Sequence, residues 1–304
     1  MHEGELTLDD ELARALIADS FPELGGQGLR RVHAAGTVNT IVRVGVDLVA
    51  RFPLAAATRE DLAAEAAAMS AFAAVCPFPT PRPYGIGSGS ERYPSAWTMQ
   101  TWVPGETARL DAHTGSPSLA IDLAELILSL RAVEADGRVF DGQGRGGDLR
   151  DHDAWVDTCL SKSGHLLNVS RTAALWQALH DLPRSGPDAM SHRDLTPFNL
   201  LVERRSGDDR LAGVLDSGSF GPVDRALDLV GAWHLFDSGP RALLRDRVAA
   251  TEIEWRRGAA WALQQAIGLG WYYERSNPAM AALGLSTIRR LLADAELSAL
   301  LSRG

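Results

Sequence analysis

Lysine is almost absent from this sequence. Lys162 is the only one among 304 residues, so arginine supplies nearly all of the 30 basic side chains. Any site that normally relies on lysine must therefore use another cation. The formal net charge of −9 argues against a protein that binds nucleic acid by neutralising phosphates. It is compatible with a cationic substrate, or simply with a well-solvated acidic surface.

Cysteine and long apolar runs are also scarce. Cys76 and Cys159 stand alone, which excludes a disulfide framework and a cysteine zinc site and is typical of free thiols in a reducing cytoplasm. The most apolar stretch, 119–133, is interrupted by charged residues, so we expect no membrane span. The acidic, amphipathic segment 1–17 does not resemble a signal peptide.

Several common catalytic motifs are missing. There is no Walker A motif, because no glycine-rich segment precedes Lys162, and neither H-E-x-x-H nor G-x-S-x-G occurs. Gly142, Gly144 and Gly147 match G-x-G-x-x-G, but no βαβ pattern surrounds them. We interpret this segment as a flexible loop.

The first hundred residues predict a small, mostly antiparallel sheet with one internal helix. Alternating or β-branched patterns favour strands, Ala- and Glu-rich patterns favour helices, and Pro77 to Pro83 reads as extended chain. The expected strands are 29–34, 40–44, 47–52, 84–87 and 96–103. The expected helices are 8–18 and 58–74.

The pattern changes after Pro104. Helical periodicity dominates, and two short strand patterns, 200–203 and 211–215, predict a hairpin with a charged turn at 204–210. The expected helices are 119–133, 153–160, 171–182, 225–236, 252–274 and 277–301. The fold class is therefore α+β, with an amino-terminal lobe at 1–103 and a larger helical lobe at 104–304.

The segment Ser191 to Leu201 is the richest in chemistry. It contains H-R-D-x-x-x-x-N, the spacing of a kinase catalytic loop. Phosphoryl transfer to an alcohol needs a carboxylate that orients the hydroxyl and accepts its proton, and Asp194 is the candidate. It also needs oxygen ligands for Mg²⁺, for which Asn199 is suited.

A second acid follows the predicted hairpin. Asp216 ends a strand pattern and precedes Ser217-Gly218, much like the D-F-G element of kinases, whose Asp binds the metal that bridges the phosphates. Each acid alone is compatible with a turn or a helix cap. The combination of Asp194, Asn199 and Asp216 in this order predicts a kinase.

These motifs resemble the aminoglycoside phosphotransferase family, which shares the protein-kinase fold. The similarity is carried by 191–202 and 213–233, extends to 31–53, 93–108 and 255–294, and is strongest to the branch of aminoglycoside and macrolide phosphotransferases. It implies a bilobal kinase-like fold, Asp194 as the base, and Asn199 and Asp216 as Mg²⁺ ligands. It also implies that Asp228 holds the backbone of the catalytic loop.

The resemblance further implies a nucleotide site in the first lobe, for ATP or GTP. Arg51 replaces the usual lysine on the α/β-phosphates, and Glu65 on the next helix orients it. Gly36, Thr37 and Asn39 form the turn over the phosphates. The hinge that carries the adenine is the segment Met99 to Val103, and its contact residues are Gln100, Thr101, Trp102 and Val103.

The sequence departs from the family at three positions. Arg193 stands where the family usually has Gly, Ser217 where it has an aromatic residue, and Thr196 where it often has His. None of the three replaces a reacting group. We expect the three departures to affect the acceptor pocket and the efficiency of catalysis.

The functional hypothesis is a cytoplasmic small-molecule kinase, monomeric or homodimeric, that phosphorylates a hydroxyl of an aminoglycoside or a macrolide. No nucleic-acid or membrane partner is expected. One alternative is a metabolic kinase of an amino alcohol or sugar, as in the related choline and homoserine kinases. The other is a non-catalytic nucleotide-binding module of the pseudokinase type, which Arg51 and Ser217 suggest.

Overall fold

The computed structural model describes residues 5–32 and 38–302. Two compact units emerge. The first comprises Met1–Ala74, Pro79–Pro104 and Gly213–Ser219, and the second comprises Val75–Phe78, Gly105–Ala212 and Phe220–Gly304. The segment Gly213–Ser219, which carries Asp216, thus belongs to the first unit although it lies far beyond residue 103 in the sequence.

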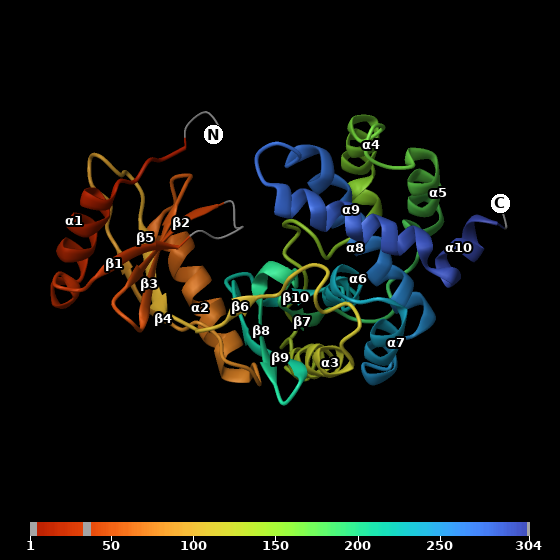
Figure 1. Cartoon of the computed structure of the whole chain (residues 1–304), viewed down its shortest axis with the longest axis horizontal. Coiled ribbons are helices and arrows are strands. Elements are labelled where there is room, and N and C mark those ends of the chain that lie inside the picture. Colours follow the sequence, from red (N-terminus) through yellow and green to blue (C-terminus); the bar gives the residue numbers. More distant parts are fainter. Residues whose placement is uncertain (1–4, 33–37, 303–304) are drawn as a thin grey trace. The chain divides into compact units, whose positions relative to one another are not determined.

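The first unit is a sheet with helices (Figure 1). Its elements are α1 (Asp10–Ser20), β1 (Leu29–Val32), β2 (Asn39–Val44), β3 (Leu48–Pro53), α2 (Arg59–Val75), β4 (Pro83–Gly87) and β5 (Trp97–Thr101). The strands are antiparallel in the order β1-β2-β3-β5-β4. The mostly antiparallel sheet expected from the sequence is confirmed.

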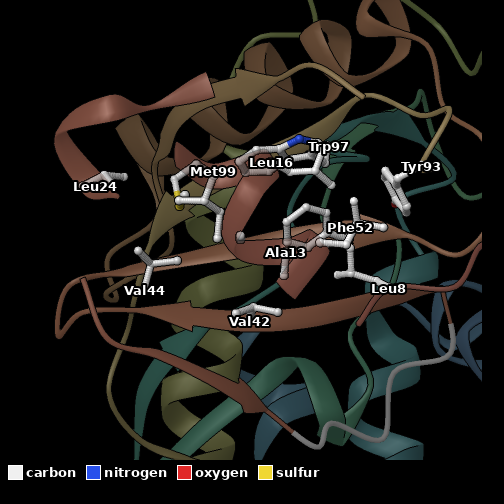
Figure 2. Packing of buried hydrophobic residues seen from close by; sticks show 13 residues of the cluster. Leu8, Ala13, Leu16, Leu24, Val42, Val44, Phe52, Tyr93, Trp97 and Met99 are labelled. Atoms are coloured by element: carbon white, nitrogen blue, oxygen red, sulfur yellow. The ribbon is translucent and has the colours of Figure 1, made fainter. Parts of the chain in front are cut away.

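Alternation along these strands divides the side chains between two faces of the sheet. Figure 2 shows one face, where Val42, Phe52, Trp97 and Met99 pack with apolar residues of α1 into a buried cluster. Asp9 caps the start of helix α1, and its carboxylate accepts a hydrogen bond from the Leu12 N–H. Helix α2 lies on the other side of the sheet (Figure 1), the side towards which the intervening residues of β3 point.

The second unit is mainly helical, with two small sheets. Its elements are β6 (Glu106–Thr107), α3 (Pro117–Arg131), α4 (Asp153–Lys162), α5 (Val169–Leu179), β7 (Ala189–Ser191), β8 (Leu200–Arg205), β9 (Asp208–Val214), β10 (Gly221–Val223), α6 (Val230–Leu235), α7 (Ser238–Arg247), α8 (Glu252–Tyr272), α9 (Pro278–Ala293) and α10 (Ala295–Leu301). The last residues of β9 lead into the first unit. No helix in the described ranges is long and apolar enough to cross a membrane.

Helix α8 is the centre of the second unit. It is buried along most of its length and packs against α4, α5, α6 and α9. Because neighbours cover it from several directions, its polar residues Gln264 and Gln265 are also buried, and each needs a hydrogen-bonding partner inside the protein.

Some elements differ from those expected. Helix α7 was not predicted, because Gly239 and Pro240 near its start look like a turn. The single helix expected at 277–301 is divided at Asp294, whose carboxylate accepts hydrogen bonds from the N–H groups of Glu296 and Leu297 and so starts α10. The helix expected at 225–236 begins with a 3₁₀ turn and becomes α-helical only at Val230.

Candidate functional site

The catalytic-loop candidate lies in the second unit, between β7 and β8. Asp228, which is 3% exposed, accepts hydrogen bonds from the Ser191 hydroxyl at 2.8 Å and from the backbone N–H groups of His192 at 3.0 Å and Arg193 at 3.2 Å. The expectation that Asp228 holds the backbone of this loop is confirmed. A buried carboxylate with several N–H and O–H donors is a firm anchor.

Arg193 adopts a left-handed backbone conformation, with φ of 72°. Glycine enters this region without strain, whereas other residues need compensation. Here the guanidinium binds the Asp141 carboxylate at 2.9 Å and the Pro222 carbonyl at 3.2 Å. These contacts explain how arginine can stand at a position where the resemblance led us to expect glycine.

Three side chains hold the Asp194 carboxylate. Asn199 donates from Nδ2 to Oδ2 at 2.9 Å and to the Asp194 carbonyl at 2.8 Å. Oδ1 accepts from Arg145 at 3.0 Å and from Gln265 Nε2 at 2.7 Å. The side chain of Asp194 nevertheless remains 39% exposed. The carboxylate of the predicted base is therefore fixed in orientation and still partly exposed.

Two of these partners were not foreseen from the sequence. Arg145 lies in the glycine-rich segment that we interpreted as a flexible loop, where Gly142, Gly144 and Gly146 all have positive φ. A Cβ atom on Gly146 would lie 2.6 Å from Val223. Glycine at this position therefore lets the loop, including the adjacent Arg145, pack closely against β10. Gln265 looked like an ordinary residue of a core helix. The available signal was the pair of glutamines, Gln264 and Gln265, in the otherwise apolar part of α8 at 258–270.

The nucleotide-clamp candidates lie in the first unit. Arg51 on β3 points to the α2 side of the sheet, since Ala50 and Phe52 belong to the core on the other face. Its guanidinium forms an ion pair of 2.8 Å with Asp216, and the two side chains are 18% and 44% exposed. The structure thus brings together the predicted phosphate clamp and one predicted metal ligand.

Glu65 on α2 acts on this ion pair through its charge. Partial desolvation raises the pKa of Glu65; the positive charge of Arg51 opposes this increase, and the negative charge of Asp216 adds to it. A Cβ atom on Gly218 would touch the Glu65 side chain at 3.4 Å. Glu65 is therefore a near neighbour of the Asp216 segment, while the direct ion pair of Arg51 is with Asp216.

The hinge candidates lie at the end of β5. The N–H of Thr101 donates to the Arg82 carbonyl at 2.9 Å, and the N–H of Trp102 donates to the Asp47 carbonyl at 2.7 Å. The N–H of the next residue, Val103, makes no such bond within the described ranges. The Gln100 side chain is 6% exposed, and its amide oxygen has no partner in the part of the chain described.

The turn candidates are covered only in part. Gly36 and Thr37 lie outside the described residues. Asn39 is the first residue of β2 and pairs with Pro53 of β3. Two residues of the second unit make other contacts. Asp153 of α4 accepts hydrogen bonds from Trp176 and His180, and Trp271 of α8 packs beside Trp155, with ring centroids 6.4 Å apart.

The antiparallel sheet unit, the helical unit and the anchored H-R-D-x-x-x-x-N loop define a phosphotransferase with a protein-kinase-like fold. The phosphotransferase enzyme family matches residues 30–261, which is more than half of the 304 residues. The chain belongs to this family and is a kinase-type phosphotransferase with a hydroxyl group as acceptor. No curated protein sequence is significantly similar to it.

Several solved structures are similar in fold. The GDP complex of aminoglycoside 2'-phosphotransferase-IIIa is 17% identical, with a TM-score of 0.65 over 93% of this chain and 98% of that one. Macrolide 2'-phosphotransferase MphH from Brachybacterium faecium is 19% identical, with a TM-score of 0.59 over 92% and 98%. The streptomycin–ATP ternary complex of APH(2")-IIa is 17% identical, with a TM-score of 0.57 over 96% and 99%. The predicted kinase-like fold is confirmed.

Proposed function

We propose that this enzyme transfers the γ-phosphoryl group of ATP or GTP to a hydroxyl of a small antibiotic-like acceptor, an aminoglycoside or a macrolide. The observation that carries the proposal is the Asp194 carboxylate, which three donors hold while the side chain stays 39% exposed. Family membership supports the reaction class. The similar structures that hold GDP, or streptomycin with ATP, support the two kinds of substrate.

In the proposed reaction Asp194 positions the acceptor hydroxyl and takes its proton. The acceptor oxygen forms a bond to the γ-phosphorus, the bond from that phosphorus to the β–γ bridging oxygen breaks, and the nucleoside diphosphate leaves. Little covalent work is left to the protein, so positioning and charge stabilisation supply most of the rate enhancement. The rigid hold on Asp194 serves the first of these.

The donor set fits Mg²⁺. Asp216 supplies an accessible carboxylate oxygen, and Asn199 turns its amide nitrogen to Asp194, which leaves the amide oxygen on the other side. Mg²⁺ is usually held by few protein oxygens together with substrate phosphates. Such a site needs no large group of ligands, and within the described ranges there is no cluster of three or more His, Cys, Asp or Glu that could hold a metal. When bound, the ion would neutralise charge on the phosphates.

The nucleotide would be held by the first unit. Arg51 offers a fixed positive charge and two parallel N–H donors for phosphate oxygens. The N–H of Val103 has no acceptor within the described chain, and a purine ring could bind it. Asn39 follows Gly36 and Thr37, the segment proposed to cover the phosphates.

Exposed aromatic side chains supply a surface for the body of the acceptor. Trp155 is 41% exposed and Tyr272 is 43% exposed, and Trp271 lies in ring contact with both. Flat aromatic faces cover the apolar face of a sugar or a macrocycle. This cluster sits on α4 and the end of α8, the helix whose Gln265 binds Asp194.

The test is turnover by Asp194→Asn, with Asp181→Asn as the matched control, because Asp181 is an exposed acid of the same unit. NTP consumption is measured against a panel of aminoglycosides and macrolides. We expect kcat to fall about 10²- to 10⁴-fold in Asp194→Asn, with nucleotide affinity nearly unchanged and the control fully active. Undiminished activity of Asp194→Asn would refute the mechanism.

The same assay separates the alternatives. Turnover with an amino alcohol or a sugar, but with no antibiotic, would favour a metabolic kinase. A nucleotide-dependent rise in melting temperature without turnover on any acceptor would favour a non-catalytic nucleotide-binding module.

A further inference from the structure

A chain of buried polar groups ends at the candidate base. Gln265 Nε2 lies 2.7 Å from Asp194 Oδ1, Gln265 Oε1 lies 3.2 Å from His234 Nε2, and His234 Nδ1 lies 2.8 Å from Thr287 Oγ1. His234 and Thr287 are both 0% exposed, and Gln265 is 9% exposed. The members come from three different helices, α6, α8 and α9, so the chain depends on tertiary packing rather than on local sequence.

The direction of every hydrogen bond in this chain is fixed. The Gln265 nitrogen must face Asp194, because the opposite amide orientation would place two oxygens against each other. The Gln265 oxygen then needs a donor, which is the Nε2–H of His234. Burial lowers the pKa of His234 to about 4, so the ring is neutral near pH 7 and Nδ1 accepts a hydrogen bond from the Thr287 hydroxyl.

All donors therefore point towards Asp194. Aligned hydrogen bonds polarise one another, and a fully satisfied buried network holds a single geometry. Oδ1 accepts hydrogen bonds from Gln265 and from the Arg145 guanidinium, whereas Oδ2 accepts one from Asn199. Oδ1 is thus occupied by two donors, and Oδ2 keeps the freer lone pair.

We infer that Thr287, His234 and Gln265 are positioning residues that fix the Asp194 carboxylate so that Oδ2 receives the proton of the acceptor hydroxyl. The inference rests on the proposed function of Asp194 as the base. It adds the oxygen atom that reacts and three residues that touch neither substrate. Without this chain only Arg145 and Asn199 would hold the carboxylate. It would then rotate more readily about its Cβ–Cγ bond, which lowers the fraction of productive geometries.

Two substitutions test the chain, each with a matched control. Gln265→Leu removes the donor to Asp194, and Gln264→Leu removes the neighbouring buried amide of α8, which binds His152 instead. Thr287→Val keeps the shape and removes the hydroxyl, and Thr287→Ser restores the hydroxyl. Steady-state kinetics with the best acceptor found for the wild-type enzyme give kcat and KM for each variant.

We expect kcat to fall roughly 10- to 100-fold in Gln265→Leu, by analogy with the loss of residues that orient a metal ligand. In Thr287→Val kcat should fall several-fold, and in Thr287→Ser it should return to nearly the wild-type value. The KM for the nucleotide should stay unchanged in all these variants. Equal kcat in Gln265→Leu and Gln264→Leu would overturn the inference. Crystal structures give a readout that does not need turnover: an Asp194 carboxylate unmoved in Gln265→Leu also refutes the positioning role, whether or not an acceptor is found.

Discussion

Acidification should destabilise the second unit through one histidine. His234 is fully buried, and burial lowers its pKa from 6.5 to about 4, with nearby Arg145 and Arg290 as smaller causes in the same direction. Well above pH 6.5 the ring is neutral in both the folded and the unfolded chain, so it contributes almost no pH dependence there. As the pH falls below 6.5, the unfolded chain binds a proton that the folded protein refuses, and stability is lost until the pH reaches about 4.

The size of the effect follows from the two pKa values. At pH 5, about 97% of unfolded chains carry the proton on this histidine, compared with about a tenth of folded ones. The free energy of unfolding should therefore be about 2 kcal/mol lower at pH 5 than at pH 7.5 from His234 alone. The full difference of the two pKa values corresponds to about 3 kcal/mol below pH 4.

Other groups also titrate in this range, so the comparison is made between the wild-type protein and His234→Gln, which cannot be protonated there. Urea unfolding at pH 7.5 and pH 5 is followed by far-UV circular dichroism, to which the helices of the second unit contribute most. We expect the wild-type protein to lose about 2 kcal/mol more than the variant. An equal loss in both proteins would show that the folded protein accommodates a charged His234, and the hydrogen-bond directions inferred above would be wrong.

Two further substitutions test the anchor of the catalytic loop and the core of the first unit. Asp228→Ala should lower the free energy of unfolding by about 2–4 kcal/mol in urea unfolding and abolish turnover, because the buried N–H groups of His192 and Arg193 lose their acceptor; wild-type stability in this variant would contradict the anchoring role. Gly87→Ala should lower stability by about 1–3 kcal/mol, since its Cβ would collide with the buried Trp97 ring. Gly26→Ala, where space is open, is the control by differential scanning fluorimetry, and equal melting temperatures would contradict the collision.

The sequence predicted most of the longer elements because each carries its own periodicity. Strands β2 and β3 alternate, and α2 is rich in strong helix formers, so local pattern and tertiary position agree. The short strands β6, β7 and β10 have only two or three residues each, too few to show a period. They form because partners from distant segments pair with them, and that information is not local.

The same distinction applies to the site. Asp194, Asn199 and Asp216 were predicted as site residues from motif spacing, and their roles stay predictions. Arg145 and Gln265 were missed because nothing in their local sequence ties them to Asp194; only the close packing of a glycine-rich loop, and the burial of α8, bring them to that carboxylate. Side chains that hold a candidate catalytic group are thus harder to find from sequence than the candidate itself.

The ion pair of Arg51 and Asp216 bears on the proposal that arginine serves here where kinases use lysine. Without substrates each side chain neutralises the other at 2.8 Å, so neither charge is left unpaired in a half-buried place. In the proposed complex both would exchange partners, Arg51 for phosphate oxygens and Asp216 for Mg²⁺, and the net charge of the assembled group would stay nearly balanced. Arginine suits this exchange because its planar guanidinium binds carboxylate and phosphate oxygens with the same geometry.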